Sequence, residues 1–277
     1  MPSITVATQD GTDVQLHLTD TGSGSPVVLI HGWPLSGASW GNQVPALVEA
    51  GHRVVTYDRR GFGESSQPAA GYDYDTFASD LDAVLTQLDL RDVALVGFSM
   101  GGGEVVRYLS RYGSDRVSKA VLAAAVPPYL YASDDNPDGG LDDATIETFE
   151  QGVTQDRAAF LDGFTTNFFS SDGELMVSED VRQEAIWVAL QASPEATLRC
   201  IGAFGRTDFR ADVAAVTVPT LVIHGDSDGI VPFEVSGKRS AEQIPGAELV
   251  VIATGPHAIN ASHVEEFNRA LIGFLAR

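Results

Sequence analysis

The sequence predicts an α/β fold in which a mostly parallel, twisted sheet carries helices on both faces. Short β-branched runs alternate with helical patterns, and most of the runs end in Gly, Asp, Ser or His. Continuous apolar runs of this kind are typical of strands that are buried on both faces. Ligands of such sheets bind outside the carboxyl ends of the strands, so we expect the functional residues there. The predicted strands cover residues 26–31, 53–57, 93–96, 119–126, 220–224 and 249–253.

Two further segments, residues 3–8 and 14–20, precede the parallel part and alternate roughly between polar and apolar residues. They flank Asp10-Gly11, a dipeptide that favours a tight turn. We therefore expect an antiparallel hairpin at the edge of the sheet, with a structural role only.

The alternation of strands and helices stops between residues 128 and 209. This stretch predicts four helices, at residues 142–152, 155–169, 178–190 and 194–209, with no strand between them. We interpret it as a helical cap inserted into the α/β core, which then comprises residues 1–127 and 210–277. A loop rich in Asp, Pro and Gly, residues 132–140, is a candidate hinge.

The composition excludes several classes of function. A net charge of −21 disfavours nucleic acids and anionic membranes as partners. No apolar run approaches the ~20 residues of a membrane helix, and no secretory signal precedes the first strand, so we expect a cytoplasmic protein. The composition does not decide the oligomeric state, and a homo-oligomer remains an alternative to a monomer.

Cysteine and histidine placement argues against a metal site. Cys200 is the only cysteine, which excludes an intramolecular disulfide and a cysteine-clustered metal site. We expect its thiol to be buried. No pair of histidines has the spacing of metal ligands with an acid or cysteine nearby.

Ser99 is the candidate nucleophile. It ends an apolar run and stands between Gly97 and Gly101, in the G-x-S-x-G pattern that mounts a serine on a strained turn between strand and helix. Glycines on both sides relieve the crowding of such a turn. By itself the pattern also fits an ordinary tight turn that contains a serine.

A nucleophilic serine needs a histidine to take its proton and a carboxylate to orient that histidine. Asp226 and Asp228 follow one predicted strand, and His257 follows the last one. The chain order Ser, Asp, His is that of the α/β-hydrolase fold. We favour Asp228 as the acid, with Asp226 as the alternative, and His257 as the base.

The oxyanion of a tetrahedral intermediate needs two hydrogen-bond donors. The backbone N–H of Met100, directly after the nucleophile, is one candidate. The other is the backbone N–H of Trp33, in the loop that starts at His31. Trp33 could instead fill a hydrophobic gap, or do both.

Two further motifs are more specific than the serine turn alone, namely the triple glycine after Ser99-Met100 and the Asp-Arg-Arg-Gly-Phe-Gly run. With these motifs the chain resembles the cofactor-free haloperoxidases, also called perhydrolases, and the arylesterases of the α/β-hydrolase fold. The segment after His257, Ala258-Ile259-Asn260, departs from the usual glycine-led pattern. The similar segments are residues 31–35, 57–65, 72–78, 97–103, 207–210 and 224–233.

The resemblance implies hydrolysis of short or aryl esters, with hydrogen peroxide able to replace water and give a peracid. It implies no haem, metal or other cofactor, supports Asp228 as the acid, and assigns the oxyanion hole to Trp33 and Met100. The proline at position 34, directly after Trp33, resembles those members of the family that are better at perhydrolysis. Matching positions suggest Val126, Phe164, Phe168 and Ile230 as walls of the substrate pocket. A lactonase or carbon–carbon bond hydrolase with the same triad, and a non-catalytic binding protein, remain the alternatives.

Overall fold

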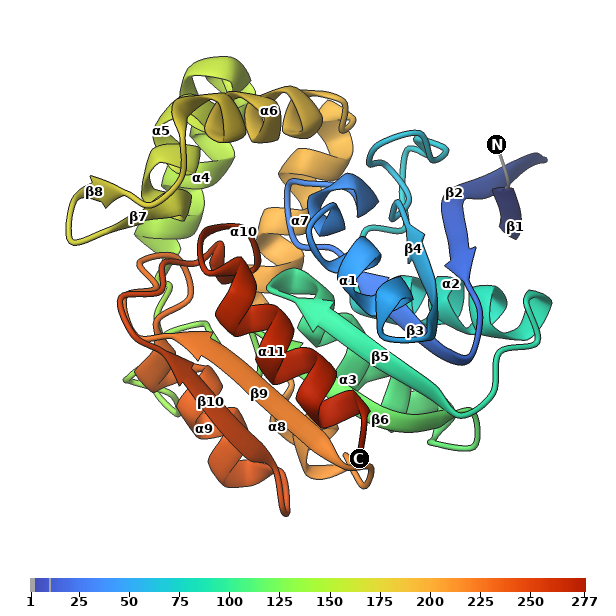
Figure 1. Ribbon diagram of the computed structural model, residues 1–277. Coiled ribbons are helices and arrows are strands. Elements are labelled where there is room, and N and C mark those ends of the chain that lie inside the picture. The colour runs from blue at the N-terminus through green and yellow to red at the C-terminus, as the bar shows by residue number, and fades with distance from the viewer. Residues whose placement is uncertain (1–2, 10) are drawn as a thin grey trace.

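The structure, a computed structural model, describes residues 3–9 and 11–277 and is built around one eight-stranded sheet (Figure 1). The strand order is β1-β2-β4-β3-β5-β6-β9-β10. From β4 to β10 all neighbours are parallel, which confirms the predicted mostly parallel α/β sheet. The strands are β1 (Ser3–Gln9), β2 (Thr12–Gly22), β3 (Ser25–Ile30), β4 (His52–Tyr57), β5 (Val93–Phe98), β6 (Val117–Ala123), β9 (Thr220–Gly225) and β10 (Glu248–Ile252).

The first two strands form the predicted hairpin. β1 pairs antiparallel with β2, and β2 continues antiparallel onto β4. Of the predicted turn, Gly11 belongs to the described residues and Asp10 lies outside them.

Helices cover both faces of the sheet, with α1 and α11 on one face and α2, α3, α8 and α9 on the other (Figure 1). Helix α3 starts directly after Ser99 and packs on β5, the strand that leads to this serine. The helices of the core are α1 (Gln43–Glu49), α2 (Tyr74–Gln87), α3 (Met100–Tyr112), α8 (Arg210–Ala214), α9 (Gly237–Gln243), α10 (Ile259–Ser262) and α11 (Val264–Leu275), with two 3-10 turns, η1 (Gly37–Trp40) and η2 (Phe233–Val235).

One predicted strand is too long. Residues 119–126 were expected to be extended, but β6 ends at Ala123. Ala124 has a φ of 42° and Val126 donates its N–H to the carbonyl of Ser99 at 3.2 Å, so the chain turns here across the end of β5. This turn carries Val126 to the serine.

The segment 128–209 lies beyond the carboxyl ends of the strands (Figure 1). Its four helices lie near the expected positions, but the first one ends at Gln155 and not at residue 152, and the last one ends at Arg206 and not at Phe209. The expectation of no strand is wrong, because a short hairpin of β7 (Ser170–Ser171) and β8 (Glu174–Leu175) connects the second and third of them. The four helices are α4 (Asp143–Gln155), α5 (Arg157–Phe169), α6 (Glu179–Leu190) and α7 (Pro194–Arg206).

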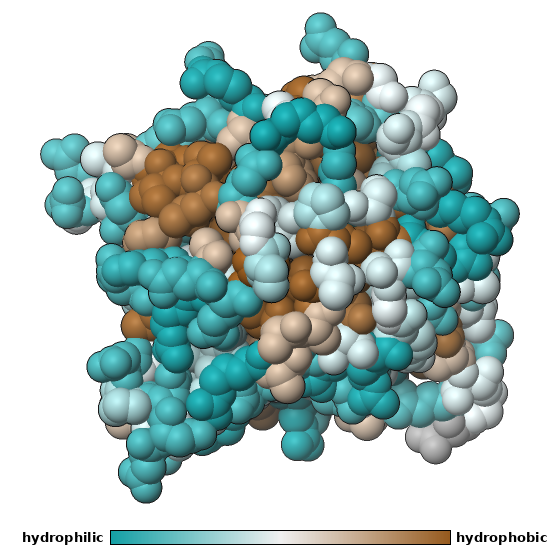
Figure 2. All heavy atoms as spheres, turned by 90° about the horizontal axis from the view of Figure 1, so that it is seen from below, coloured by the Kyte–Doolittle hydropathy of each residue, from teal (hydrophilic) through white to brown (hydrophobic). Residues whose placement is uncertain are grey.

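The interior is apolar and the exterior mainly hydrophilic. Figure 2 shows hydrophilic side chains over most of one face, with separate hydrophobic patches between them. Cys200 lies inside and is fully buried, as expected. Within residues 3–9 and 11–277, no helix is both long and apolar enough to cross a membrane.

Candidate active site

Ser99 stands on a strained turn between β5 and α3. Its φ of 54° and ψ of −119° are rare for a residue with a side chain. A Cβ at Gly97 would lie 2.4 Å from the carbonyl oxygen of Gly101, and a Cβ at Gly101 would lie 2.4 Å from that of Ile30. Only glycine fits at both positions, and the turn directs the Ser99 hydroxyl to the carboxyl edge of the sheet.

His257 reaches Ser99 from the loop after β10. Its Nε2 atom lies 2.9 Å from the Ser99 Oγ, and the ring is 1% exposed. The rings of Phe98 and Phe168 pack against it, with centroids 5.1 and 5.0 Å away. These contacts fix the imidazole where it can accept the proton of the hydroxyl.

Asp228 completes a chain of hydrogen bonds. Its Oδ2 atom lies 2.7 Å from Nδ1 of His257, so Nδ1 carries the hydrogen and Nε2 is left as the acceptor. The backbone N–H groups of Ile230 and Val231 donate to Oδ1 at 2.9 and 2.8 Å. Burial alone would raise the pKa of Asp228, but the neighbouring His257 and His224 rings outweigh it and hold this pKa well below its usual range.

The alternative acid, Asp226, lies in the same turn but has other partners. Its Oδ1 atom accepts the backbone N–H of Thr254 at 2.7 Å and the hydroxyl of Ser227 at 3.1 Å. It ties the loop after β9 to the loop that carries His257. The structure therefore brings Asp228, and not Asp226, to the histidine.

The two candidate oxyanion donors flank the serine. Met100 opens α3, and its N–H has no hydrogen-bond partner among the described residues, as is usual for the first turn of a helix. The Trp33 N–H is likewise without a partner in the part of the chain that the structure describes. The loop of Trp33 passes close to the nucleophile, since a Cβ on Gly32 would lie 2.9 Å from that of Ser99.

The Trp33 side chain has a separate packing role. Its indole N–H donates to the carbonyl of Thr197 on α7 at 3.0 Å, and its ring packs against Phe164 at 5.1 Å. The residue thus connects the loop beside Ser99 to the helices beyond the sheet.

A buried polar network holds the Trp33 loop in place, and the sequence did not reveal it. The Arg59 N–H donates to Nε2 of His31 at 2.9 Å, so Nδ1 of His31 carries the hydrogen and donates to the Gly32 carbonyl at 2.9 Å. The Arg59 guanidinium pairs with Glu104 of α3 at 2.8 Å. Arg59 belongs to the Asp-Arg-Arg motif and could be singled out in the sequence. Glu104 is a lone glutamate inside a helix, and no pattern in the sequence indicates that it pairs with Arg59.

The cavity at Ser99 is small. It measures about 20 Å³, room for about one water molecule, and Trp33 and His257 line it. Of the expected pocket residues, Val126, Phe164 and Ile230 line it as well. Phe168 does not, because its ring lies against His257 and faces a second cavity on the other side.

In the described part of the chain, no three His, Cys, Asp or Glu side chains gather in the way that metal ligands do. The chemistry available at the site is that of a hydroxyl, an imidazole, a carboxylate and backbone N–H groups.

Comparison with known proteins places this geometry in a family. Residues 25–264 match the family model described as alpha/beta hydrolase fold. A non-heme chloroperoxidase of Kitasatospora aureofaciens is 45% identical over 97% of this chain and 98% of its own length. A bifunctional esterase/perhydrolase of Acinetobacter calcoaceticus is 36% identical over 98% of both chains.

A solved structure gives the same result. The crystal structure of a bromoperoxidase from Bacillus anthracis superposes with a TM-score of 0.97 at 58% identity, covering 100% of this chain and 99% of that one. The chain therefore belongs to the α/β-hydrolase fold family and, within it, to the non-heme haloperoxidases and their esterase relatives.

Proposed function

We propose that this protein hydrolyses short-chain or aryl carboxylic esters through an acyl-enzyme on Ser99, and that hydrogen peroxide can replace water as the acyl acceptor. The observation that carries the proposal is the unbroken chain from Ser99 Oγ to His257 at 2.9 Å and from His257 to Asp228 at 2.7 Å. Such a chain makes a serine hydroxyl nucleophilic without a metal.

The proposed reaction begins when Ser99 Oγ attacks the ester carbonyl carbon while its proton passes to Nε2 of His257. The Met100 and Trp33 N–H groups then stabilise the negative charge on the carbonyl oxygen, supported by the positive end of α3. His257 returns the proton to the departing alcohol, and Asp228 stabilises the transient imidazolium.

The acyl-enzyme is then released by a second nucleophile. Water or hydrogen peroxide gives its proton to His257, attacks the acyl carbon and breaks the bond to Ser99 Oγ, which regains a proton. Water yields the carboxylic acid, and peroxide yields the peracid. Relatives named as a non-heme chloroperoxidase and as an esterase/perhydrolase, at 45% and 36% identity, support the peroxide route.

The size of the cavity supports a short acyl group. The volume of about 20 Å³ beside Ser99 has room for about one water molecule, so a short acyl group needs a small movement of side chains and a long one needs a much larger movement. Aromatic rings of α5 and α7, those of Phe164 and Phe204, stand in the way of a longer chain.

We further propose that residues 128–209 act as a cap that controls access to Ser99. Three of its helices contribute side chains to the small cavity, namely Phe149 of α4, Phe164 of α5 and Phe204 of α7. The surroundings of the acyl group therefore depend on this segment as well as on the core.

The test is hydrolysis of p-nitrophenyl acetate by wild type, Ser99→Ala and Ser110→Ala, with peracid formation from acetate and peroxide followed in the same preparations. Ser110 is an exposed serine of α3 and serves as the matched control. We expect Ser99→Ala to lose both activities and Ser110→Ala to keep them. Turnover that survives in Ser99→Ala, or a folded wild type inactive on this ester, would refute the proposal.

A further inference from the structure

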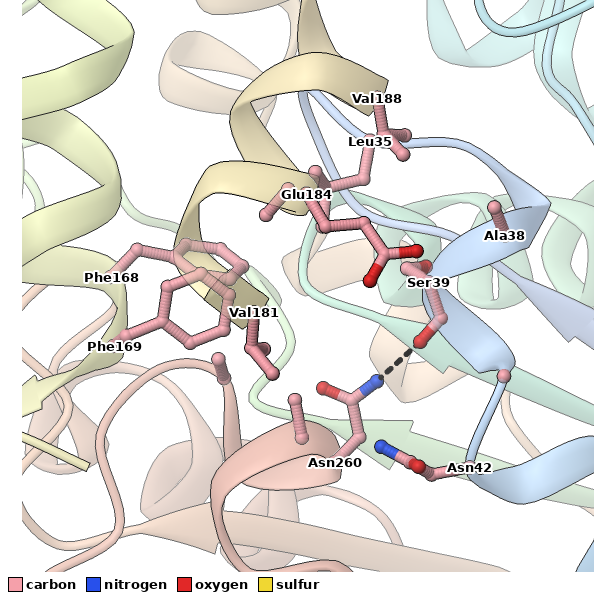
Figure 3. Close-up of a pocket in the computed structure, with 14 residues that line it drawn as sticks. Leu35, Ala38, Ser39, Asn42, Phe168, Phe169, Val181, Glu184, Val188 and Asn260 are labelled. Atoms are coloured by element: carbon pink, nitrogen blue, oxygen red, sulfur yellow. Dashed lines mark hydrogen bonds between the residues drawn. The ribbon is translucent and has the colours of Figure 1, made fainter. Parts of the chain in front are cut away.

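A second cavity, of about 230 Å³, lies between α6 and the turn η1 (Figure 3). Val181, Glu184 and Val188 of α6 form one wall, and Phe168 and Phe169, at the end of α5, form another. It shares no lining residue with the small cavity at Ser99. It is thus a separate compartment, about ten times larger, and the function proposed above makes no use of it.

Phe168 separates the two compartments. Its ring lines the second cavity on one side and lies edge-on to the His257 ring, 5.0 Å away, on the other. A molecule in the second cavity would therefore lie close to the catalytic centre without occupying it.

Asn260 presents a hydrogen-bond acceptor to this cavity. The residue is 4% exposed, and its Nδ2 atom donates to the Ser39 carbonyl at 3.2 Å. That bond fixes the amide so that Oδ1 points away from Ser39 and into the cavity (Figure 3). None of the described residues donates a hydrogen bond to this oxygen, and it is not one of the buried polar atoms that lack a partner. It therefore faces the open space of the cavity, where a ligand can donate to it.

Glu184 adds a negative charge. Its carboxylate extends over the cavity from α6 (Figure 3), and within residues 3–9 and 11–277 it forms no ion pair. The part of the chain that the structure describes contributes no Lys, Arg or His to the lining. Ser39 and Asn42 are further polar residues of the lining, and the remaining walls are phenyl rings, aliphatic side chains and Gly41.

These features select one chemical class of ligand. A carboxylate, a carbonyl-type oxygen and aromatic rings together favour an organic cation that donates hydrogen bonds. The net charge of −21 attracts cations and repels carboxylates. The apolar walls accommodate an uncharged tail.

We propose that the second cavity binds a small primary ammonium ion with an aryl or alkyl tail. The ammonium group donates to the Glu184 carboxylate and to Oδ1 of Asn260, and the tail packs against Phe168 and Phe169. Because the two cavities share no residue, such a ligand binds without displacing the ester. The site exists whether or not Ser99 forms an acyl-enzyme.

The test measures binding of 2-phenylethylammonium by saturation-transfer NMR and titration calorimetry, beside 2-phenylethanol and 3-phenylpropionate. We expect the ammonium ion to bind most tightly, the alcohol less tightly and the carboxylate not at all. Glu184→Gln should weaken binding of the ammonium ion roughly three- to fivefold and leave the alcohol unchanged. Asp180→Asn, which removes an exposed charge from the same helix outside the cavity, is the control and should change neither.

A second variant locates the ligand. Ala185→Phe places a ring in the cavity and should abolish binding, while p-nitrophenyl acetate hydrolysis and far-UV circular dichroism confirm that the variant is folded. Binding that survives in folded Ala185→Phe, equal affinity for the carboxylate, or no effect of Glu184→Gln would overturn the proposal. The binding measurements and circular dichroism can be repeated in Ser99→Ala, so failure of the proposed esterase function leaves the test intact.

Discussion

Nε2 of His224 lies 3.2 Å from Oδ2 of Asp228, the same oxygen that Nδ1 of His257 contacts at 2.7 Å. The Val231 carbonyl also lies 2.8 Å from this Nε2, and because a carbonyl can only accept, Nε2 carries the hydrogen. The Nε2–H group of His224 therefore contacts both Asp228, the proposed acid, and the Val231 carbonyl in the loop that follows Asp228. His224 is a positioning residue: it acts through Asp228 and does not touch the substrate.

Replacement of His224 should impair turnover more than substrate binding. His224→Ala removes a hydrogen bond to a buried carboxylate, so we expect kcat on p-nitrophenyl acetate to fall about tenfold with little change in KM. His224→Gln, whose amide N–H can reach the same acceptors, should restore most of kcat. Steady-state kinetics of both variants decide the matter. An equal loss in both would mean that the ring matters through its packing on Phe233 and not through its donor.

Ile230 should set the length of the acyl group. Its side chain lines the cavity of about 20 Å³ at Ser99, while only its backbone N–H is bound to Asp228. Ile230→Ala enlarges the cavity and should raise kcat/KM for p-nitrophenyl butyrate relative to the acetate by about tenfold. Ile272→Ala on α11 is the control. An unchanged preference in Ile230→Ala would show that the acyl group lies elsewhere.

His31 should make the protein sensitive to acid. Burial, then the charge of Arg59, lower the pKa of His31 well below that of a free imidazole, against the opposing effect of its bond to the Gly32 carbonyl. The unfolded chain takes up this proton near pH 6.5 and the folded chain only at lower pH. The stability that neutral His31 provides is therefore complete above about pH 6.5 and is lost as the pH falls below it.

Denaturant unfolding at pH 7.5, 6.0 and 5.0 measures this effect. Between pH 6.5 and 5 the free energy of unfolding of the wild type should fall more steeply than that of His31→Gln, by up to about 1.4 kcal/mol per pH unit. Parallel curves for the two proteins would contradict the assignment.

Cys200 should be inert in the folded protein. Burial raises the pKa of its thiol to about 12 and outweighs the charge of Arg59, which lowers this pKa. The reactive thiolate is therefore scarce near neutral pH. Native protein treated with iodoacetamide at pH 8 should gain no mass, and guanidinium-unfolded protein should gain one carbamidomethyl group. Modification of the native protein at the same rate would mean that α7 opens readily.

The strands were predictable because each is a short apolar run that ends in a turn residue. β3 and β9 lie within one residue of their predicted bounds. The hairpin between α5 and α6 was missed because its strands have two residues each, too few for a periodic pattern. Its turn, Asp172-Gly173 with φ values of 50° and 82°, did carry a recognisable signal.

His257 and Asp228 could be predicted because the proposed chemistry requires a base and an acid, and the fold supplies them in a fixed chain order. The direction in which a side chain points was harder to predict from the sequence. Phe168 and Phe164 are four residues apart on α5 and their rings are 5.7 Å apart, yet only Phe164 reaches the cavity of the serine. Partners distant in sequence, such as Arg59 with Glu104, depend on the packing of the sheet and leave no local pattern.

The central claim is that Ser99 is the nucleophile, and covalent trapping tests it most directly. Wild-type protein treated with diethyl p-nitrophenyl phosphate should lose activity, release one p-nitrophenol per chain and carry a diethyl phosphate adduct on the peptide that contains Ser99. His257→Ala should react far more slowly, because the serine then keeps its proton. Inactivation with the adduct on another residue, or full reactivity of Ser99→Ala, would contradict the mechanism.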